Sequence, residues 1–152
     1  MPDLRVQPGE VVVAESGKGR YAQVVLAGRH VLAADEPESV GGSDTGPGPY
    51  EYLLAALGAC TAITLRMYAA RKGWPLERVA VRLRQKKIHA EDCAECETKE
   101  GRIDRIDRTI ELSGALGAAE RAALLTIADK CPVHRTLSTK NLIVTELAAP
   151  ER

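Results

Sequence analysis

Cys60 and Cys131 are the two side chains of this sequence that most directly suggest chemistry. Cys60 lies within an apolar segment, where a cysteine taken by itself is more typical of a small core side chain. Cys131 directly precedes Pro132, a residue that suits the first position of a new short helix. His134 and Arg135 follow, and a thiol at a helix N-terminus near cations is favoured as the nucleophilic thiolate. If the two sulfurs meet they form a redox pair, and otherwise they are two buried side chains.

The other two cysteines, Cys93 and Cys96, form a Cys-x-x-Cys motif with His89 four residues before it. Such a motif is typical of half a zinc site or of a redox dithiol. Four zinc ligands are not within reach along the sequence unless a residue from elsewhere joins them. Two further interpretations stay open: a polar surface connection whose thiols matter little, and a relay that exchanges with a disulfide between Cys60 and Cys131.

The elements that must position these side chains follow an α+β pattern. β-branched and alternating runs predict strands over 10–14, 21–26, 29–33, 79–84, 103–112 and 141–147. Apolar periodicity predicts helices over 50–71 and 117–130, each associated with one cysteine of the first pair. The order β-β-β-α-β-β-α-β, with mostly antiparallel strands, indicates a single α+β domain over residues 1–152. The loop over 35–49 is long, and loops of this length are typically functional or mobile.

The first predicted helix is apolar or small on every face of its first four turns. One face consists of residues spaced by three and four, namely Leu53, Leu57, Cys60, Thr64 and Met67. A helix without a polar face has to be enclosed on all sides. Because one sheet of a chain this short cannot enclose it, we expect a partner subunit to supply the other wall.

Charge and composition exclude several classes of function. The chain has 21 basic and 21 acidic side chains, and this balance argues against nucleic acid or an anionic membrane as the main partner. The longest uncharged stretch, over 52–65, has 14 residues and is too short to span a bilayer. The N-terminus has no secretory signal, which predicts a cytoplasmic protein whose cysteines are reactive or metal-binding rather than structural.

Three segments closely resemble the OsmC/Ohr family. They are DEP at 35–37, GGSDTGPGPYEYLLAALGACT at 41–61 and ADKCPVHRTL at 128–137, and the resemblance extends over nearly the whole chain. It implies the OsmC-like fold, an intertwined homodimer with the two Cys-bearing helices at its centre and the active sites at the interface. It also implies a thiol-dependent peroxidase that reduces organic hydroperoxides.

By this resemblance Cys60 is the peroxidatic cysteine and Cys131 the resolving one. The peroxide would oxidise Cys60 to a sulfenic acid and leave as an alcohol, and Cys131 would then close a disulfide. A thiol reductant restores the pair, and in the family this is a dihydrolipoyl group. No cofactor or metal is implied.

The family also places an arginine and a glutamate beside the reactive thiol. Arg20 matches the arginine best and Arg29 is second, although either could be a solvated cation at a strand end. Glu51 lies nine residues before Cys60, whereas the family carboxylate lies ten before, where this chain has Tyr50. Glu51 could instead be a first-turn acid that favours the helix dipole.

Two other functions compete with the peroxidase. One is a non-enzymatic dimer that binds an apolar ligand or partner, with the cysteines merely buried. The other, less favoured, is a hydrolase with Cys131 or Cys60 as nucleophile and His134 as base. The hydrolase lacks an orienting acid and a glycine-rich turn around the nucleophile.

Overall fold

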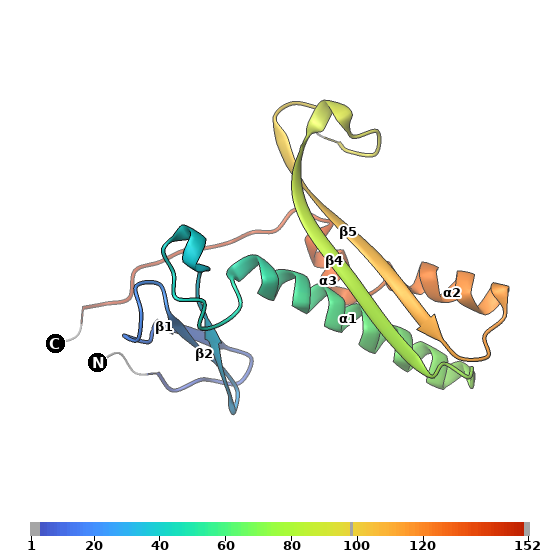
Figure 1. Cartoon of the computed structure of the whole chain (residues 1–152), viewed down its shortest axis with the longest axis horizontal. Coiled ribbons are helices and arrows are strands. Elements are labelled where there is room, and N and C mark those ends of the chain that lie inside the picture. The colour runs from blue at the N-terminus through green and yellow to red at the C-terminus, as the bar shows by residue number, and fades with distance from the viewer. Residues whose placement is uncertain (1–3, 98, 151–152) are drawn as a thin grey trace. The chain divides into compact units, whose positions relative to one another are not determined.

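The computed structural model describes residues 4–97 and 99–150 of the chain (Figure 1). Its elements are β1 (Val11–Glu15), β2 (Gln23–Ala27), β3 (His30–Ala34), the short 3₁₀ turn η1 (Glu38–Val40), α1 (Pro49–Lys72), β4 (Arg78–His89), the 3₁₀ turn η2 (Ala90–Asp92), β5 (Arg102–Ser113), α2 (Ala118–Ala128) and α3 (Pro132–Leu137). The chain divides into two compact units, the first ending at Ala55 and the second starting at Ala56. The α+β class is confirmed, and the single domain over 1–152 stays a prediction.

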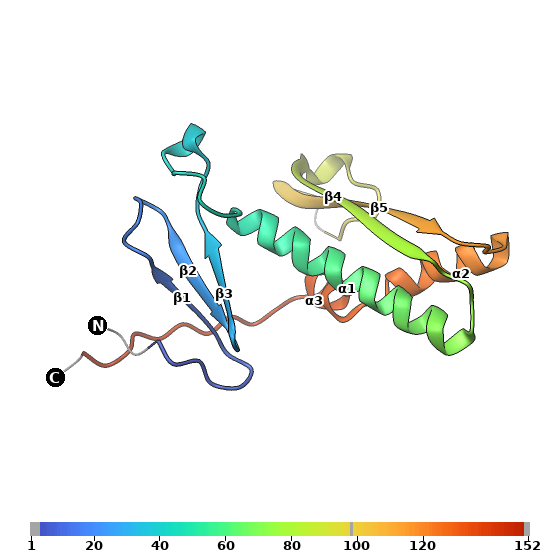
Figure 2. The same ribbon diagram turned by 60° about the horizontal axis from the view of Figure 1, so that its bottom comes forward.

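The first unit contains an antiparallel three-stranded sheet in the order β1-β2-β3 (Figure 2). Val25 at the centre of β2 pairs with Val13 of β1 and with Leu32 of β3. Gly28 and Arg29 form the two-residue turn between β2 and β3, and Gly28 has a φ of 57°. A left-handed residue in such a short turn matches the twist of the flanking strands. The three strands predicted for this part of the chain are confirmed.

The long loop after β3 is held by the carboxylate of Asp35, which is only 3% exposed. One oxygen accepts the backbone N–H of Glu36 at 2.8 Å. The other accepts the Thr45 hydroxyl at 2.7 Å and the backbone N–H groups of Thr45 and Ser43, both at 3.2 Å. The Thr45 hydroxyl, followed by these backbone donors, holds the pKa of Asp35 below its ordinary value against the opposing effect of burial. The loop is therefore tied back onto its own start, which fixes the chain entering α1.

Replacing Asp35 with Asn is expected to lower the melting temperature at pH 7 by roughly 5 °C, because the amide replaces one of the two accepting oxygens with a donor. A lowered pKa in the folded state means that the carboxylate stabilises the fold fully above the unfolded pKa of about 3.9. This stabilisation is lost as the pH falls through the folded value. The difference in melting temperature between the parent and Asp35→Asn should therefore shrink below about pH 4.

The matched control is Asp44→Asn, because Asp44 is exposed in the same loop and its φ of 52° suits asparagine equally well. Thermal melts from pH 2 to pH 7 should show no such pH-dependent difference for the control. A difference between the parent and Asp35→Asn that stays constant down to pH 2 would contradict the proposed role of the carboxylate.

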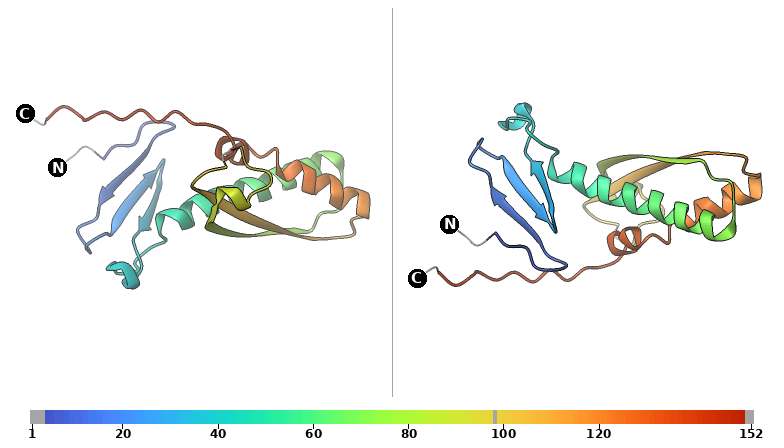
Figure 3. Two further views of the ribbon diagram at one scale, coloured as in Figure 1. Left: turned by 90° about the horizontal axis from the view of Figure 1, so that it is seen from above. Right: turned by 90° about the horizontal axis from the view of Figure 1, so that it is seen from below.

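The second unit is built on a hairpin of two twelve-residue antiparallel strands, β4 and β5. Helices α1 and α2 pack against this hairpin (Figure 3). The buried residues at the centre of this core are Leu65, Ala69, Leu76, Leu124 and Ala128. A Cβ at Gly58 would lie 2.8 Å from Cδ1 of Leu83, so the absence of a side chain there lets α1 approach β4 closely.

The buried stripe of α1 is not the predicted face. It consists of Leu57, Gly58, Thr61, Leu65 and Ala69, so that of the predicted face only Leu57 is fully buried. Because nearly every position in the first turns of this helix is apolar or small, periodicity alone could not identify the inward side.

Part of the apolar surface of α1 stays open, with Ile63 55% and Met67 67% exposed. The helix has 24 residues, and an 18-residue window has a mean hydropathy of 1.5 with 22% of it buried. By length and composition alone α1 could cross a membrane, which the 14-residue uncharged stretch did not suggest. Core helices of soluble proteins have the same properties, and α1 already contributes to the core of the second unit.

The strand predicted over 141–147 is wrong for the single chain. The described residues after α3 contain no strand, and several of their apolar side chains are almost fully exposed, namely Leu142, Ile143, Val144 and Leu147. A strand needs a neighbouring edge for its backbone hydrogen bonds, and no strand pairs with this segment. The alternation of the sequence indicates an extended segment but does not supply its partner.

Candidate functional site

Cys131 is the N-cap residue of α3 and is completely buried. Its Sγ accepts the backbone N–H of His134 at 3.2 Å, and Pro132 occupies the first turn of the helix. The helix that the sequence predicted after Cys131 is therefore confirmed. Because the first N–H groups of a helix lack backbone partners, the sulfur takes the place that a Ser or Asp oxygen often has.

Helix α1 meets Cys131 through Thr61, the residue that follows Cys60. Thr61 is completely buried, and its Oγ1 lies 3.9 Å from Sγ of Cys131. The hydroxyl of Thr61 also donates a hydrogen bond to the carbonyl of Leu57 at 2.7 Å. Cys60 is half-buried, and both Cys60 and Cys131 are free thiols. The structure thus places Cys131 next to the helical turn that carries Cys60.

Arg108 on β5 completes this cluster, although the sequence interpretation missed it. Its side chain is 12% exposed and donates to Thr61 Oγ1 at 3.1 Å and to the Ala128 carbonyl at 3.4 Å. Its other terminal nitrogen donates to Asp129 at 2.8 Å. Thr61 has one proton and two lone pairs, so its proton goes to Leu57 and its lone pairs can accept from Arg108 and from the Cys131 thiol.

One signal in the sequence could have found Arg108. It shares a strand face with Ile106 and Ile110, because alternate residues of a strand point to the same side. A cation within an apolar face needs a polar partner when that face is covered. Arg108, which stands between two isoleucines on this face, therefore needs such a partner.

Asp129 and His134 lie at the rim of the same cluster. Nδ1 of His134 is 3.9 Å from Asp129 Oδ1, but this carboxylate is bound more closely by Arg108. His134 contacts Cys131 through its backbone N–H, and in the described contacts its ring makes no hydrogen bond to a thiol. Asp129 is an acid near His134, which the sequence interpretation of a Cys–His hydrolase lacked. The ring of His134 is not aligned with a thiol, however, so it is not placed to act as the base.

A hollow of about 450 Å³ opens above this cluster. It is lined by Leu57, Asp104, Ile106, Arg108, Ile110, Leu125, Asp129, His134, Leu137 and Ser138. Its wall combines five aliphatic side chains with five polar or charged ones, so it can contact both an apolar group and a polar group of a small molecule.

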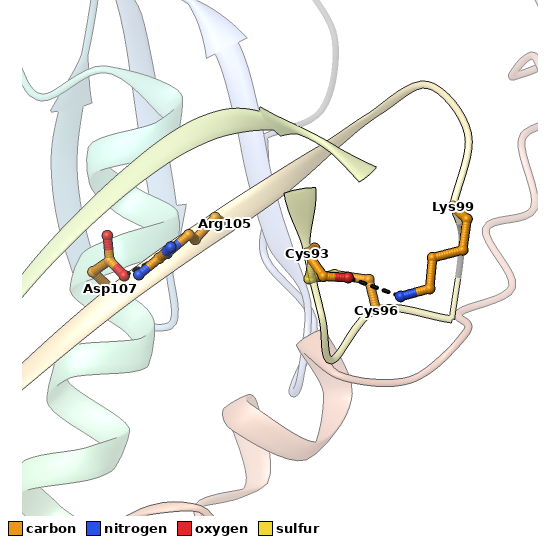
Figure 4. The surroundings of a disulfide bond; sticks show 5 residues. All are labelled: Cys93, Cys96, Lys99, Arg105 and Asp107. Carbon is orange, nitrogen blue, oxygen red and sulfur yellow. Dashed lines mark hydrogen bonds and ion pairs between the residues drawn. A yellow bond between two sulfur atoms is a disulfide. The ribbon is translucent and has the colours of Figure 1, made fainter. Parts of the chain in front are cut away.

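Cys93 and Cys96 are joined in a disulfide within the loop between β4 and β5 (Figure 4). Lys99 donates to the Cys93 carbonyl at 2.8 Å, and both cysteines are half-buried. The zinc interpretation is not supported, because the disulfide occupies both sulfurs. Over 4–97 and 99–150, no group of three or more potential metal ligands lies together.

The family model of OsmC-like proteins matches residues 41–146, which is more than half of the chain. The chain belongs to the OsmC family. No curated protein matches it.

Solved structures of OsmC and related proteins share this fold. An OsmC-like protein from Mycoplasma pneumoniae is 17% identical with a TM-score of 0.65, covering 90% of this chain and 89% of that one. An organic hydroperoxide resistance protein OsmC from Legionella pneumophila is 19% identical with a TM-score of 0.60, covering 84% and 87%. The organic hydroperoxide resistance protein OhrB of Bacillus subtilis is 16% identical with a TM-score of 0.56, also covering 84% and 87%. The OsmC-like fold is thereby confirmed.

The two helper residues that the family resemblance suggested lie in the first unit. The Glu51 carboxylate accepts the backbone N–H of Gly48 at 2.7 Å, so it caps the start of α1. The guanidinium of Arg20 lies 5.2 Å from the centre of the Tyr21 ring, and Arg29 lies in the turn after β2. Cys60 and Cys131 belong to the second unit, so a role for Arg20, Arg29 or Glu51 beside the thiols stays a prediction.

Proposed function

We propose that this OsmC-family protein is a thiol-dependent peroxidase that reduces organic hydroperoxides to alcohols. The observation that carries the proposal is the pair of free thiols in one unit, with buried Cys131 against Thr61 and Cys60 next to Thr61 along α1. The structural relatives from Legionella pneumophila and Bacillus subtilis are described as organic hydroperoxide resistance proteins, which supports this substrate class.

In the first step the Cys60 thiolate attacks the terminal oxygen of the hydroperoxide. The O–O bond breaks, the alkoxide leaves with a proton as the alcohol, and Cys60 becomes a sulfenic acid. In the second step the sulfur of Cys131 attacks the sulfur of Cys60, and water leaves with the proton of the Cys131 thiol. An external dithiol then reduces the disulfide by exchange and becomes oxidised itself.

The residues around Cys131 suit the second step. The hydroxyl oxygen of Thr61 can accept a hydrogen bond from the Cys131 thiol, and Arg108 donates to the same oxygen. The negative charge that the Cys131 sulfur carries once its proton is lost is stabilised by the backbone N–H of His134 and by the positive charge of Arg108 in the same cluster. The aliphatic side chains of the hollow, which include Leu57 of α1, suit the organic group of a hydroperoxide.

We also propose a homodimer, as the family resemblance implies. The exposed Ile63 and Met67 on α1, Leu125 on α2 and the apolar segment around Leu142 are surfaces that a second chain would cover. In such a dimer Arg20 and Glu51 would assist Cys60. We place the protein in the cytoplasm, in defence against oxidative stress, with a dithiol reductant such as a dihydrolipoyl protein.

A peroxide titration tests the proposed function. Protein in which Cys60 and Cys131 are free thiols and Cys93–Cys96 is a disulfide is mixed with cumene hydroperoxide, and peptides are mapped by mass spectrometry. We expect one equivalent of peroxide per chain to be consumed, one equivalent of alcohol to form, and Cys60 to be linked to Cys131. Two thiols that stay reduced with the peroxide unconsumed would instead favour a non-enzymatic protein that binds an apolar ligand.

A further inference from the structure

The peroxidase chemistry leaves the Cys93–Cys96 disulfide without a function. It lies in the loop that joins the ends of β4 and β5, after the η2 turn (Figure 1). Both of its cysteines are half-buried, as is Cys60, whereas Cys131 has no exposed surface at all. Thiol–disulfide exchange requires a thiolate to reach a sulfur atom directly. Of these sulfurs, the pair in the loop is therefore more open to a reductant from outside than Cys131.

The hollow beside this disulfide and the hollow beside Arg108 share residues of β5, and the two together are called the groove. Cys93 and Cys96 line a hollow of about 470 Å³ together with Asp104 and Ile106. The same two residues of β5 line the hollow above Arg108 and His134. The two hollows therefore adjoin, and the side chains of one strand line both of them. Figure 4 shows the loop beside this strand, with Arg105 and its partner Asp107 drawn on it.

We propose, building on the peroxidase function, that Cys93 and Cys96 form a second redox centre. An external dithiol reduces the Cys93–Cys96 disulfide and leaves as its own disulfide. One thiolate of the loop then attacks the Cys60–Cys131 disulfide and forms a mixed disulfide, which the second loop thiol resolves. Two electrons and two protons pass in each exchange, so that Cys60 and Cys131 end as thiols and the loop disulfide is restored.

The position of the motif determines how far the loop sulfurs must reach in a relay. The loop lies at one end of the groove, and Arg108 lies about 17 Å along the strand from Ile103, the first residue of β5 that lines the loop's hollow. The loop sulfurs have to move along the groove to react with the inner pair. Cys96 lies six residues before Arg102, and six residues span up to about 20 Å when extended, so the chain is long enough for this sulfur to reach the level of Arg108.

Peroxide stoichiometry tests the relay. Fully reduced protein, with four thiols per chain, is expected to consume two equivalents of cumene hydroperoxide, because the loop thiols reduce the inner disulfide once and allow a second reaction. The Cys93→Ser/Cys96→Ser variant is expected to consume one. If the parent also consumes one equivalent, the relay is wrong and the peroxidase stands. If no thiol reacts, the peroxidase itself is wrong.

Two controls separate the relay from direct oxidation and from loop damage. In fully reduced Cys60→Ser protein the loop thiols should stay reduced, since peroxide has no route to them through the inner pair. Oxidation of those thiols at the parental rate would overturn the relay. Ala94→Ser changes the exposed residue within the motif but keeps both cysteines, and it should consume two equivalents like the parent.

Single-cysteine variants of the motif should trap the intermediate. In Cys96→Ser or Cys93→Ser the remaining loop thiol has no partner to release it, so peroxide treatment should leave a mixed disulfide with Cys60 or Cys131. Turnover of Cys93→Ser/Cys96→Ser with dihydrolipoamide should fall at least about tenfold. Absence of a mixed disulfide in both single variants, together with unchanged turnover, would exclude the relay.

Discussion

Cys60→Ser is expected to reduce cumene hydroperoxide more slowly than the parent by a factor on the order of 10³ or more, because a serine hydroxyl cannot replace a thiolate as the nucleophile. Cys131→Ser should behave differently. It keeps the first step, so it should consume one equivalent of peroxide and then stop with a sulfenic acid on Cys60. The measurement is peroxide consumption in rapid-mixing experiments, with a sulfenic-acid probe and mass analysis of the Cys60 peptide.

The control is Ala59→Ser, which places the same hydroxyl on an exposed neighbouring position of α1 and leaves the thiol in place. It should react at the parental rate. If Cys60→Ser consumes hydroperoxide as fast as the parent, Cys60 is not the peroxidatic residue. If Cys131→Ser consumes peroxide over repeated cycles at the parental rate, Cys131 is not the resolving residue.

Arg108→Met is expected to slow disulfide closure by about 10²-fold while the first oxidation of Cys60 stays close to the parental rate. The described contacts of Arg108 run to Thr61 and Asp129 on the Cys131 side of the cluster, so its loss removes support for charge on that sulfur. Sulfenic acid should therefore accumulate. Arg108→Lys keeps the charge but not the fork of donors, and it should recover part of the closure rate.

Stability has to be measured alongside the rates, because Arg108→Met also leaves buried polar groups with fewer partners, at a cost of about 1–3 kcal/mol. Arg82→Met is the matched control, since Arg82 forms an exposed ion pair with Glu111 across the same hairpin. It should change neither closure rate nor stability appreciably. Equal slowing of both steps in Arg108→Met would show a structural role only.

Several features of the site follow from local sequence. Pro132 after Cys131 sufficed to predict α3 and the thiol at its start, because the capping of a helix depends on residues next to one another. The strands of the first unit and the two strands of the second were predicted for a similar reason, since alternation and turn residues act over short distances. The strand predicted over 79–84 is too short, because β4 continues to His89. The resemblance of three segments predicted the family that the comparison then confirmed.

Features that depend on contacts between distant segments could not be predicted in this way. The inward side of α1 is set by the approach of Gly58 to Leu83 and not by its own composition, which is apolar on most sides. Arg108 reaches Thr61 across 47 positions of sequence, and no local pattern shows that contact. The strand predicted over 141–147 failed because a strand is stabilised by a neighbour that the chain alone does not provide.

The cysteines show the same division. The sequence by itself determined that this chain carries two kinds of thiol pair, because residue type, spacing and a following proline are local properties. Only the tertiary structure joined Cys93 to Cys96 and left Cys60 and Cys131 free, with Cys131 buried at the start of α3 and next to Thr61 of α1. The pairing and burial of a sulfur depend on which segments the fold brings within a few ångströms, and that is settled by packing over the whole unit.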